Sequence, residues 1–83
     1  MGSFGVRGGP HKGAEHAGAE ARLENEARRV GARSFRHDAS DHVYAFVIDA
    51  PSTPHAFIAV TDVFRPVFGD LWWAEVASTN HLN

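Results

Sequence analysis

The spacing of apolar residues changes along the chain, from a helical period to a strand period. In residues 14–32, Leu23, Ala27 and Val30 recur at intervals of four and three. This spacing is typical of one face of an amphipathic helix, and the segment is dominated by alanine, glutamate and arginine, which favour helix formation. We therefore predict one helix over 14–32, with Gly31 as its C-cap glycine.

Beyond this segment the apolar residues alternate or run continuously, as they do in β-strands. Residues 42–50 (HVYAFVIDA) are rich in β-branched and aromatic side chains and are apolar on both faces, which favours a central strand. Similar patterns predict three further strands, at 32–37, 55–64 and 71–77. Because the connections are short, we expect hairpins. The predicted fold class is α+β, with one N-terminal helix packed on a three- to four-stranded antiparallel β-meander.

The two ends of the chain are predicted to lie outside this fold. Residues 1–13 contain five glycines and a proline, a composition typical of a flexible segment. We expect a flexible Gly-rich tail over 1–13, a single α+β domain over 14–78 and a C-terminal tail over 79–83. A chain of 83 residues buries a limited share of its surface, and small domains commonly gain stability from a partner subunit.

Two adjacent tryptophans lie in the last predicted strand. Successive side chains of a strand point to opposite faces, so Trp72 and Trp73 cannot both face the helix. We assign Trp72 to the core and Trp73 to a second apolar face that one helix cannot cover. An exposed apolar face with a tryptophan is a candidate binding surface. Its expected residues are Trp73, Phe57, Leu71, Val47 and Val43.

Two explanations of this second face remain open. Segments of the chain itself, such as the loop at 65–70, could fold over it. Alternatively it binds a partner, either a second copy of the chain in a homo-oligomer or a larger protein. We favour the second explanation, which makes the chain a small non-catalytic interaction or regulatory module, acting as a homodimer or as an inhibitor or accessory protein.

Four arginines suggest a different function, because they could form a basic strip where the helix meets the first strand: Arg28, Arg29, Arg33 and Arg36. Such a strip would suit an RNA-binding or RNA-cleaving, toxin-like protein. A helix before an antiparallel sheet with scattered basic residues resembles, in layout, the bacterial RNA-cleaving toxins of the RelE and ParE type. However, the net charge is −2, and residues 34–83 carry two arginines against six acidic residues. An acidic sheet is a poor surface for a phosphate backbone, so a nucleic-acid partner is the less favoured prediction.

Candidate chemistry is sparse. The chain has no cysteine, which excludes disulfides, thiolate zinc sites and thiol catalysis. His37, Asp38, Asp41 and His42 surround one predicted turn with nitrogen and oxygen donors, but their spacing matches no standard motif. We therefore predict no metal and no cofactor. No nucleophile elbow or phosphate loop is present, and the sequence favours a protein that is not an enzyme.

The sequence also gives an expected location. No segment approaches the roughly 20 apolar residues of a membrane span, and the N-terminus lacks the apolar core of a signal peptide. We expect no membrane association and a cytoplasmic location. Frequent alanine, glycine and arginine suggest a GC-rich coding sequence, as in a bacterium or its phage.

Overall fold

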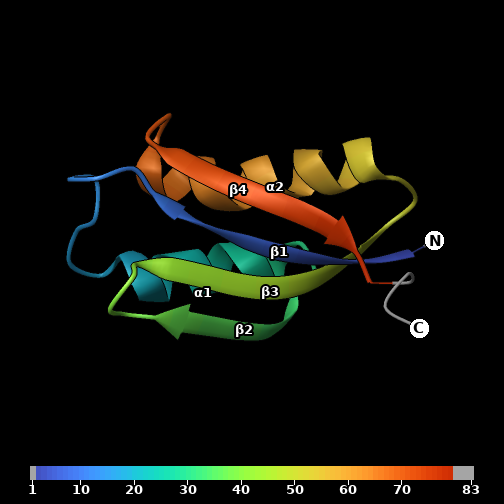
Figure 1. Ribbon diagram of the computed structural model, residues 1–83, viewed down its shortest axis with the longest axis horizontal. Coiled ribbons are helices and arrows are strands. Elements are labelled where there is room, and N and C mark those ends of the chain that lie inside the picture. Colours follow the sequence, from blue (N-terminus) through green and yellow to red (C-terminus); the bar gives the residue numbers. More distant parts are fainter. Residues whose placement is uncertain (1, 80–83) are drawn as a thin grey trace.

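The structure, a computed structural model, describes residues 2–79 and consists of a four-stranded sheet with two helices packed against it (Figure 1). In chain order the elements are β1 (Gly2–Pro10), α1 (Ala19–Arg29), β2 (Arg33–Asp38), β3 (Val43–Ala50), α2 (Thr53–Phe68) and β4 (Trp72–Ser78). The strand order is β2-β3-β1-β4, and every neighbouring pair is antiparallel. This is the split βαβ, or ferredoxin-like, topology. The predicted α+β class and antiparallel sheet are confirmed, but a strand precedes the helix and the sheet is not a meander.

The prediction of a flexible tail over 1–13 is wrong, because residues 2–10 form β1 between β3 and β4 (Figure 1). Phe4 and Val6 alternate with Gly5 and Arg7, and the two apolar side chains are buried. The glycines reflect close packing as well as backbone freedom. A Cβ atom on Gly8 would meet the carbonyl oxygen of the neighbouring strand and an aromatic ring of α2, so only glycine fits there.

The strand predicted over 55–64 is also wrong, because this segment belongs to α2. Its β-branched and aromatic composition suggested a strand, but its buried residues follow the helical period: Ala56, Val60, Val63, Phe64, Val67 and Phe68. The Ser52 hydroxyl accepts a hydrogen bond from the backbone N–H of His55, which caps the helix, and a proline occupies its first turn. Local capping and helical packing therefore outweigh strand propensity.

The predicted first helix is confirmed but is shorter than expected. It spans Ala19–Arg29 within the predicted 14–32, and Leu23 and Ala27 of its apolar stripe are buried. Gly18 precedes the helix with a φ of 83°, and Gly31 follows it with a φ of 80°. Both angles lie in the left-handed region that glycine adopts most easily, so the two glycines delimit the helix.

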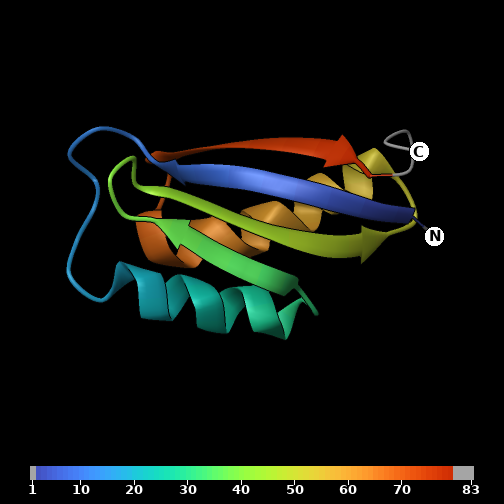
Figure 2. The ribbon, with the colours of Figure 1, turned by 60° about the horizontal axis from the view of Figure 1, so that its bottom comes forward.

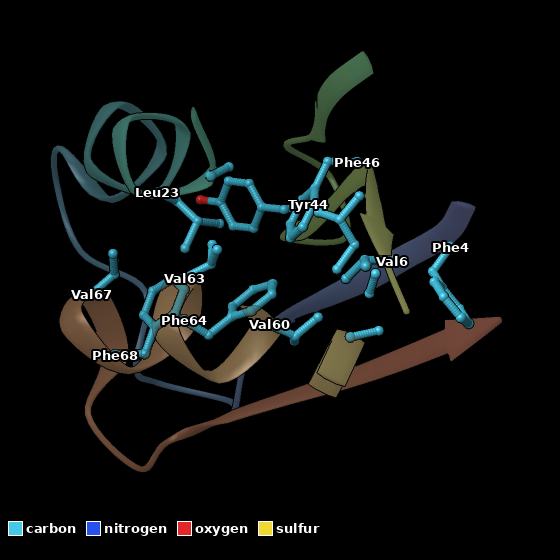
Figure 3. Packing of buried hydrophobic residues seen from close by; sticks show 14 of the residues in the cluster. Phe4, Val6, Leu23, Tyr44, Phe46, Val60, Val63, Phe64, Val67 and Phe68 are labelled. Carbon is cyan, nitrogen blue, oxygen red and sulfur yellow. The ribbon is translucent and has the colours of Figure 1, made fainter. Parts of the chain in front are cut away.

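Both helices pack on the same face of the sheet (Figures 1 and 2). The core lies between the two layers, where Leu23 of α1 and Phe64 of α2 meet Tyr44 and Phe46 of β3 (Figure 3). Within residues 2–79, the opposite face carries no helix. Of the predicted C-terminal tail over 79–83, residues 80–83 lie outside the described residues, while the backbone N–H of Thr79 bonds to the carbonyl oxygen of Ser3.

Candidate functional site

The face of the sheet opposite the two helices, called here the open face, is the candidate binding surface. Its side chains are those that alternate with the buried ones along each strand. It consists of Ser3, Gly5, Arg7 and Gly9 of β1; Arg33, Arg36 and Asp38 of β2; Val43, Ala45, Val47 and Asp49 of β3; and Trp73, Glu75 and Ala77 of β4.

Both Arg33 and Arg36 reach the open face because β2 contains an irregularity. The pairing of β2 with β3 shifts between these two residues, and Ser34 between them has a φ of 60°. An extra residue in one strand of a pair reverses the alternation of side chains beyond it. The bulge therefore places two arginines, three positions apart, on one side of the same strand.

The strand register arranges the open face in rows that cross the sheet. From β2 to β4, two of these rows are Arg36, Ala45, Arg7 and Glu75, and then Arg33, Val47, Gly5 and Ala77. At the end near the β2–β3 turn, Asp38 pairs with Val43 and Gly9 pairs with Trp73, while the β1–β3 pairing ends at Gly8. Cross-strand neighbours of this kind lie about 5 Å apart. Small residues therefore occupy several positions of the two central strands.

These small residues leave the open face hollowed. One hollow of about 520 Å³ lies at the end near the β2–β3 turn, and its walls include Arg7, Arg36, Val43 and Ala45. A second hollow, of about 220 Å³, adjoins it and also contacts Arg7, Arg36 and Ala45. Because bulky side chains are absent from these positions, another molecule can approach the backbone of the central strands closely.

Trp73 and the charges beside it form the β4 side of the open face. The Arg7 guanidinium lies 5.7 Å from the centre of the Trp73 ring, a cation–π arrangement. Its Nη1 atom is 3.8 Å from the Glu75 carboxylate, and both side chains are exposed. Exposed ion pairs of this length contribute little to stability, so Glu75 is largely free to meet another cation.

The opposite corner of the open face is held together by Asp49. The Ser3 hydroxyl donates to its Oδ1 atom at 2.7 Å, and Arg33 donates to both carboxylate oxygens at 2.9 and 3.2 Å. The hydrogen bond from Ser3, followed by that from Arg33, lowers the pKa of Asp49 below its usual value. Arg33 is thus engaged, whereas the Arg36 side chain makes no hydrogen bond or ion pair within residues 2–79.

The structure brings three of the five expected interface residues together. Val43, Val47 and Trp73 all lie on the open face and are half-buried. Phe57 lies instead on α2, where 43% of it is exposed, and Leu71 lies in the turn before β4. The misplacement of Phe57 follows directly from reading α2 as a strand.

The expected arginine strip is not continuous. Arg28 and Arg29 lie on α1, in the helix layer, and pair with Glu24 and Glu26 of the same helix. Arg33 and Arg36 lie on the open face, on the other side of the sheet. Because β1 precedes α1, the layout that resembled RNA-cleaving toxins is absent as well.

A polar cluster at the start of α1 has no counterpart in the predicted sites. The Glu15 carboxylate accepts a hydrogen bond from the Tyr44 hydroxyl at 3.0 Å and lies 3.3 Å from Nδ1 of His42. Burial, followed by the hydrogen bond to Glu15, raises the pKa of Tyr44. Nearby, Nδ1 of His37 is 2.6 Å from the Glu20 carboxylate.

This cluster ties the segment before α1 to the ends of β2 and β3. The His37 ring stacks on the Tyr44 ring with centroids 4.1 Å apart, and its Nε2 atom is buried without a hydrogen-bond partner in the described part of the chain. His37 and His42 were considered together as possible metal ligands. In the structure they contact different carboxylates, His37 that of Glu20 and His42 that of Glu15. Within residues 2–79 no group of three or more histidine, aspartate or glutamate side chains is arranged to hold a metal ion. No local motif connects Glu15 with Tyr44, so only the fold reveals the cluster.

Sequence reasoning also missed the β1 members of the open face. The alternation of apolar and small or charged residues over 4–8 was the available signal, but the glycine content obscured it.

In the described chain, no helix has both the length and the apolarity required to cross a bilayer. No protein-family model matches this sequence, and a search of curated proteins finds no significant match.

Proposed function

We propose that this chain is a small, non-catalytic protein-interaction module that associates as a homodimer through the open face of its sheet. The observation that carries the proposal is the composition of that face. Val43, Ala45 and Val47 run along β3, no helix of the described residues covers them, and Trp73 lies on the same side. Uncovered apolar surface with a tryptophan is typical of a binding surface.

The size of the open face suits a weak association. Four strands spaced about 4.8 Å apart and about seven residues long give a face of roughly 19 by 24 Å. Packing two copies face to face would bury on the order of 1,000 Å² in total, which is at the lower end for specific interfaces. We therefore expect a dimer whose population depends on concentration in the micromolar range.

The alternative function, RNA binding, has less support. Domains with a four-stranded sheet can bind RNA by stacking bases on aromatic side chains of the sheet. On the open face, the two central strands present Val43, Ala45, Val47 and small or charged residues, and none of these is aromatic. The four arginines are also divided between two layers. A sheet face that packs against another protein needs neither aromatic side chains on its central strands nor a continuous strip of arginines.

Light scattering in line with size exclusion, over a range of concentrations, tests the proposal. We expect the mass to rise from 9.0 kDa towards twice that value as concentration increases. Val47→Asp places a charge in the middle of the open face and should keep the chain monomeric. Ile58→Asp is a matched control, because Ile58 lies on α2 and is 61% exposed.

Circular dichroism would first confirm that both variants fold. A wild-type chain that remains monomeric at every concentration, or a Val47→Asp variant that dimerises like the wild type, would overturn self-association through this face. Monomeric behaviour would redirect attention to docking onto a larger protein. Salt-sensitive binding to an RNA oligonucleotide, lost in Arg36→Ala, would instead support the alternative function.

A further inference from the structure

The charges of the open face are arranged asymmetrically between its two edge strands. Arg36 lies on the edge strand β2 and has no side-chain partner within residues 2–79. Glu75 lies on the other edge strand, β4, in the same cross-strand row, and its contact with Arg7 is long at 3.8 Å. The one acid on β2, Asp38, accepts two hydrogen bonds from Ser40. Arg36 on one edge and Glu75 on the other are therefore opposite charges that a partner could pair.

We propose that two copies pack open face to open face about a two-fold axis that lies between the sheets and runs parallel to the strands. This arrangement rests on the proposed function of the open face and specifies its partner. Rotation about such an axis places β2 of one copy over β4 of the other, and β3 over β1. Stacked sheets lie about 10 Å apart, and a crossing of about 30° between their strands puts the axis about 15° from each strand direction. Every row crosses this axis, and the middle row, at the centre of the crossing, stays opposite its own copy.

The row that contains Arg36 and Glu75 is complementary to itself in this arrangement. Read from β2 to β4 it runs Arg36, Ala45, Arg7 and Glu75, and the second copy presents the same row in reverse. Arg36 then faces Glu75 of the partner subunit, while Arg7 faces the partner's Ala45. Each arginine thus meets either an opposite charge or a small residue that leaves room for it.

The row of Val47 is complementary in size. Val47 of β3 lies beside Gly5 of β1, and the rotation places it over Gly5 of the partner subunit. An added Cβ on Gly5 would have only ordinary contacts, the nearest atoms being 3.9 Å away. The valine of one copy therefore has room over the glycine of the other.

The other two-fold axis in the plane between the sheets is unfavourable. An axis perpendicular to the strands places each strand over its own copy, so β2 lies over β2 and β4 over β4. The arginines of β2 would then face each other, and so would Glu75 and its copy. Like charges opposed at a close interface disfavour that arrangement. The distribution of Arg36 and Glu75 therefore selects the axis parallel to the strands.

Charge exchange tests this arrangement by light scattering at low salt. Arg36→Glu and Glu75→Arg, made separately, should each raise the dimer dissociation constant about tenfold or more, because the symmetric pair is lost twice per dimer. The double variant Arg36→Glu/Glu75→Arg restores opposite charges and should return close to wild-type affinity. Arg29→Glu on α1 is the matched control for charge, and it should leave dimerisation unchanged.

Cross-linking provides a second readout that does not depend on affinity. The chain contains no cysteine, so Arg36→Cys and Glu75→Cys each introduce a unique thiol. When the two variants are mixed and treated with a short bismaleimide, we expect links between residue 36 of one copy and residue 75 of the other. Predominant links between two copies of residue 36 would overturn the proposed axis.

The outcomes separate the arrangement from the proposed function. If Val47→Asp abolishes the dimer but the charge variants behave like wild type, the face is correct and the arrangement is wrong. If the double variant is as weak as the single variants, the pairing of Arg36 with Glu75 is wrong. If the wild type forms no dimer at any concentration, both the arrangement and self-association fail.

Discussion

Trp72 and Trp73 are adjacent in the sequence but lie on opposite faces of the sheet. The Trp72 ring stacks against Phe64 of α2, with centroids 5.4 Å apart and planes at 14°. The Trp73 ring lies instead beneath the Arg7 guanidinium on the open face. One tryptophan thus completes the core, and the other is available to a partner.

Replacing the two tryptophans should therefore have different effects. Trp72→Ala removes a ring packed on the core and should lower the free energy of unfolding by about 3 kcal/mol. Trp73→Ala should change monomer stability by about 1 kcal/mol or less, but it should weaken association. Urea unfolding of dilute samples and light scattering of concentrated samples measure the two effects. Equal loss of stability in both variants would contradict the assignment of Trp73 to the open face.

Two glycines of β1 should differ sharply in their tolerance of alanine. A Cβ atom on Gly8 would lie 2.5 Å from the carbonyl oxygen of Trp73 and 3.0 Å from the Phe64 ring, so Gly8→Ala forces the backbone or the core to move. We expect a loss of about 2 kcal/mol or more. Gly5→Ala is the matched control, because its Cβ would meet nothing closer than 3.9 Å. Thermal melts at low concentration compare the stabilities of the two variants. Similar melting temperatures would argue against the central position of β1.

Acid should weaken the corner of the open face around Asp49. Its pKa is lowered in the folded chain by Ser3 and Arg33, so the folded state favours the charged form. The resulting stabilisation is present above the ordinary value of 3.8 and is lost as pH falls below it through the lower folded pKa. Asp49→Asn should therefore show a shallower fall in melting temperature below pH 4 than the wild type does. An unchanged acid profile would show that Asp49 is not a source of this dependence.

Alkaline pH should expose the opposite behaviour at Tyr44, the only tyrosine of the chain. Its pKa is raised by burial and by the hydrogen bond to Glu15, so the folded state favours the neutral phenol. The stabilisation is present below the ordinary pKa of 10.0 and is lost as pH rises above it. Phenolate absorbance near 295 nm should appear together with unfolding, followed by circular dichroism. Ionisation near pH 10 in a chain that remains folded would contradict the burial of this hydroxyl.

The parts of the fold that could be predicted are those specified by local pattern. The helix stripe of Leu23 and Ala27, the continuous apolar run of β3 and the alternation around the two tryptophans each identify their element from a few neighbouring residues. Such periodicity follows from backbone geometry alone. For the same reason, Val43, Val47 and Trp73 could be assigned to one surface before their partners were known.

The two errors in the assignment of secondary structure have distinct physical causes. Residues 55–64 combine strand-forming residues with helical spacing. They form a helix because Ser52 caps its start and because Val60 and Phe64 pack in the core. The glycines of β1 look like flexibility in sequence, but Gly8 is required where two strands and a helix approach closely. In both cases the outcome depends on neighbours that are distant along the chain.

By itself, the sequence determined the fold class, a helix within 14–32, a strand at 42–50 and the opposite orientations of Trp72 and Trp73, because these follow from local spacing. Only the tertiary structure decided that β1 enters the middle of the sheet, that both helices cover one face, and that Arg36 and Glu75 share a row at opposite edges of the other. Strand order and register arise from contacts between residues far apart in sequence. No local pattern encodes them.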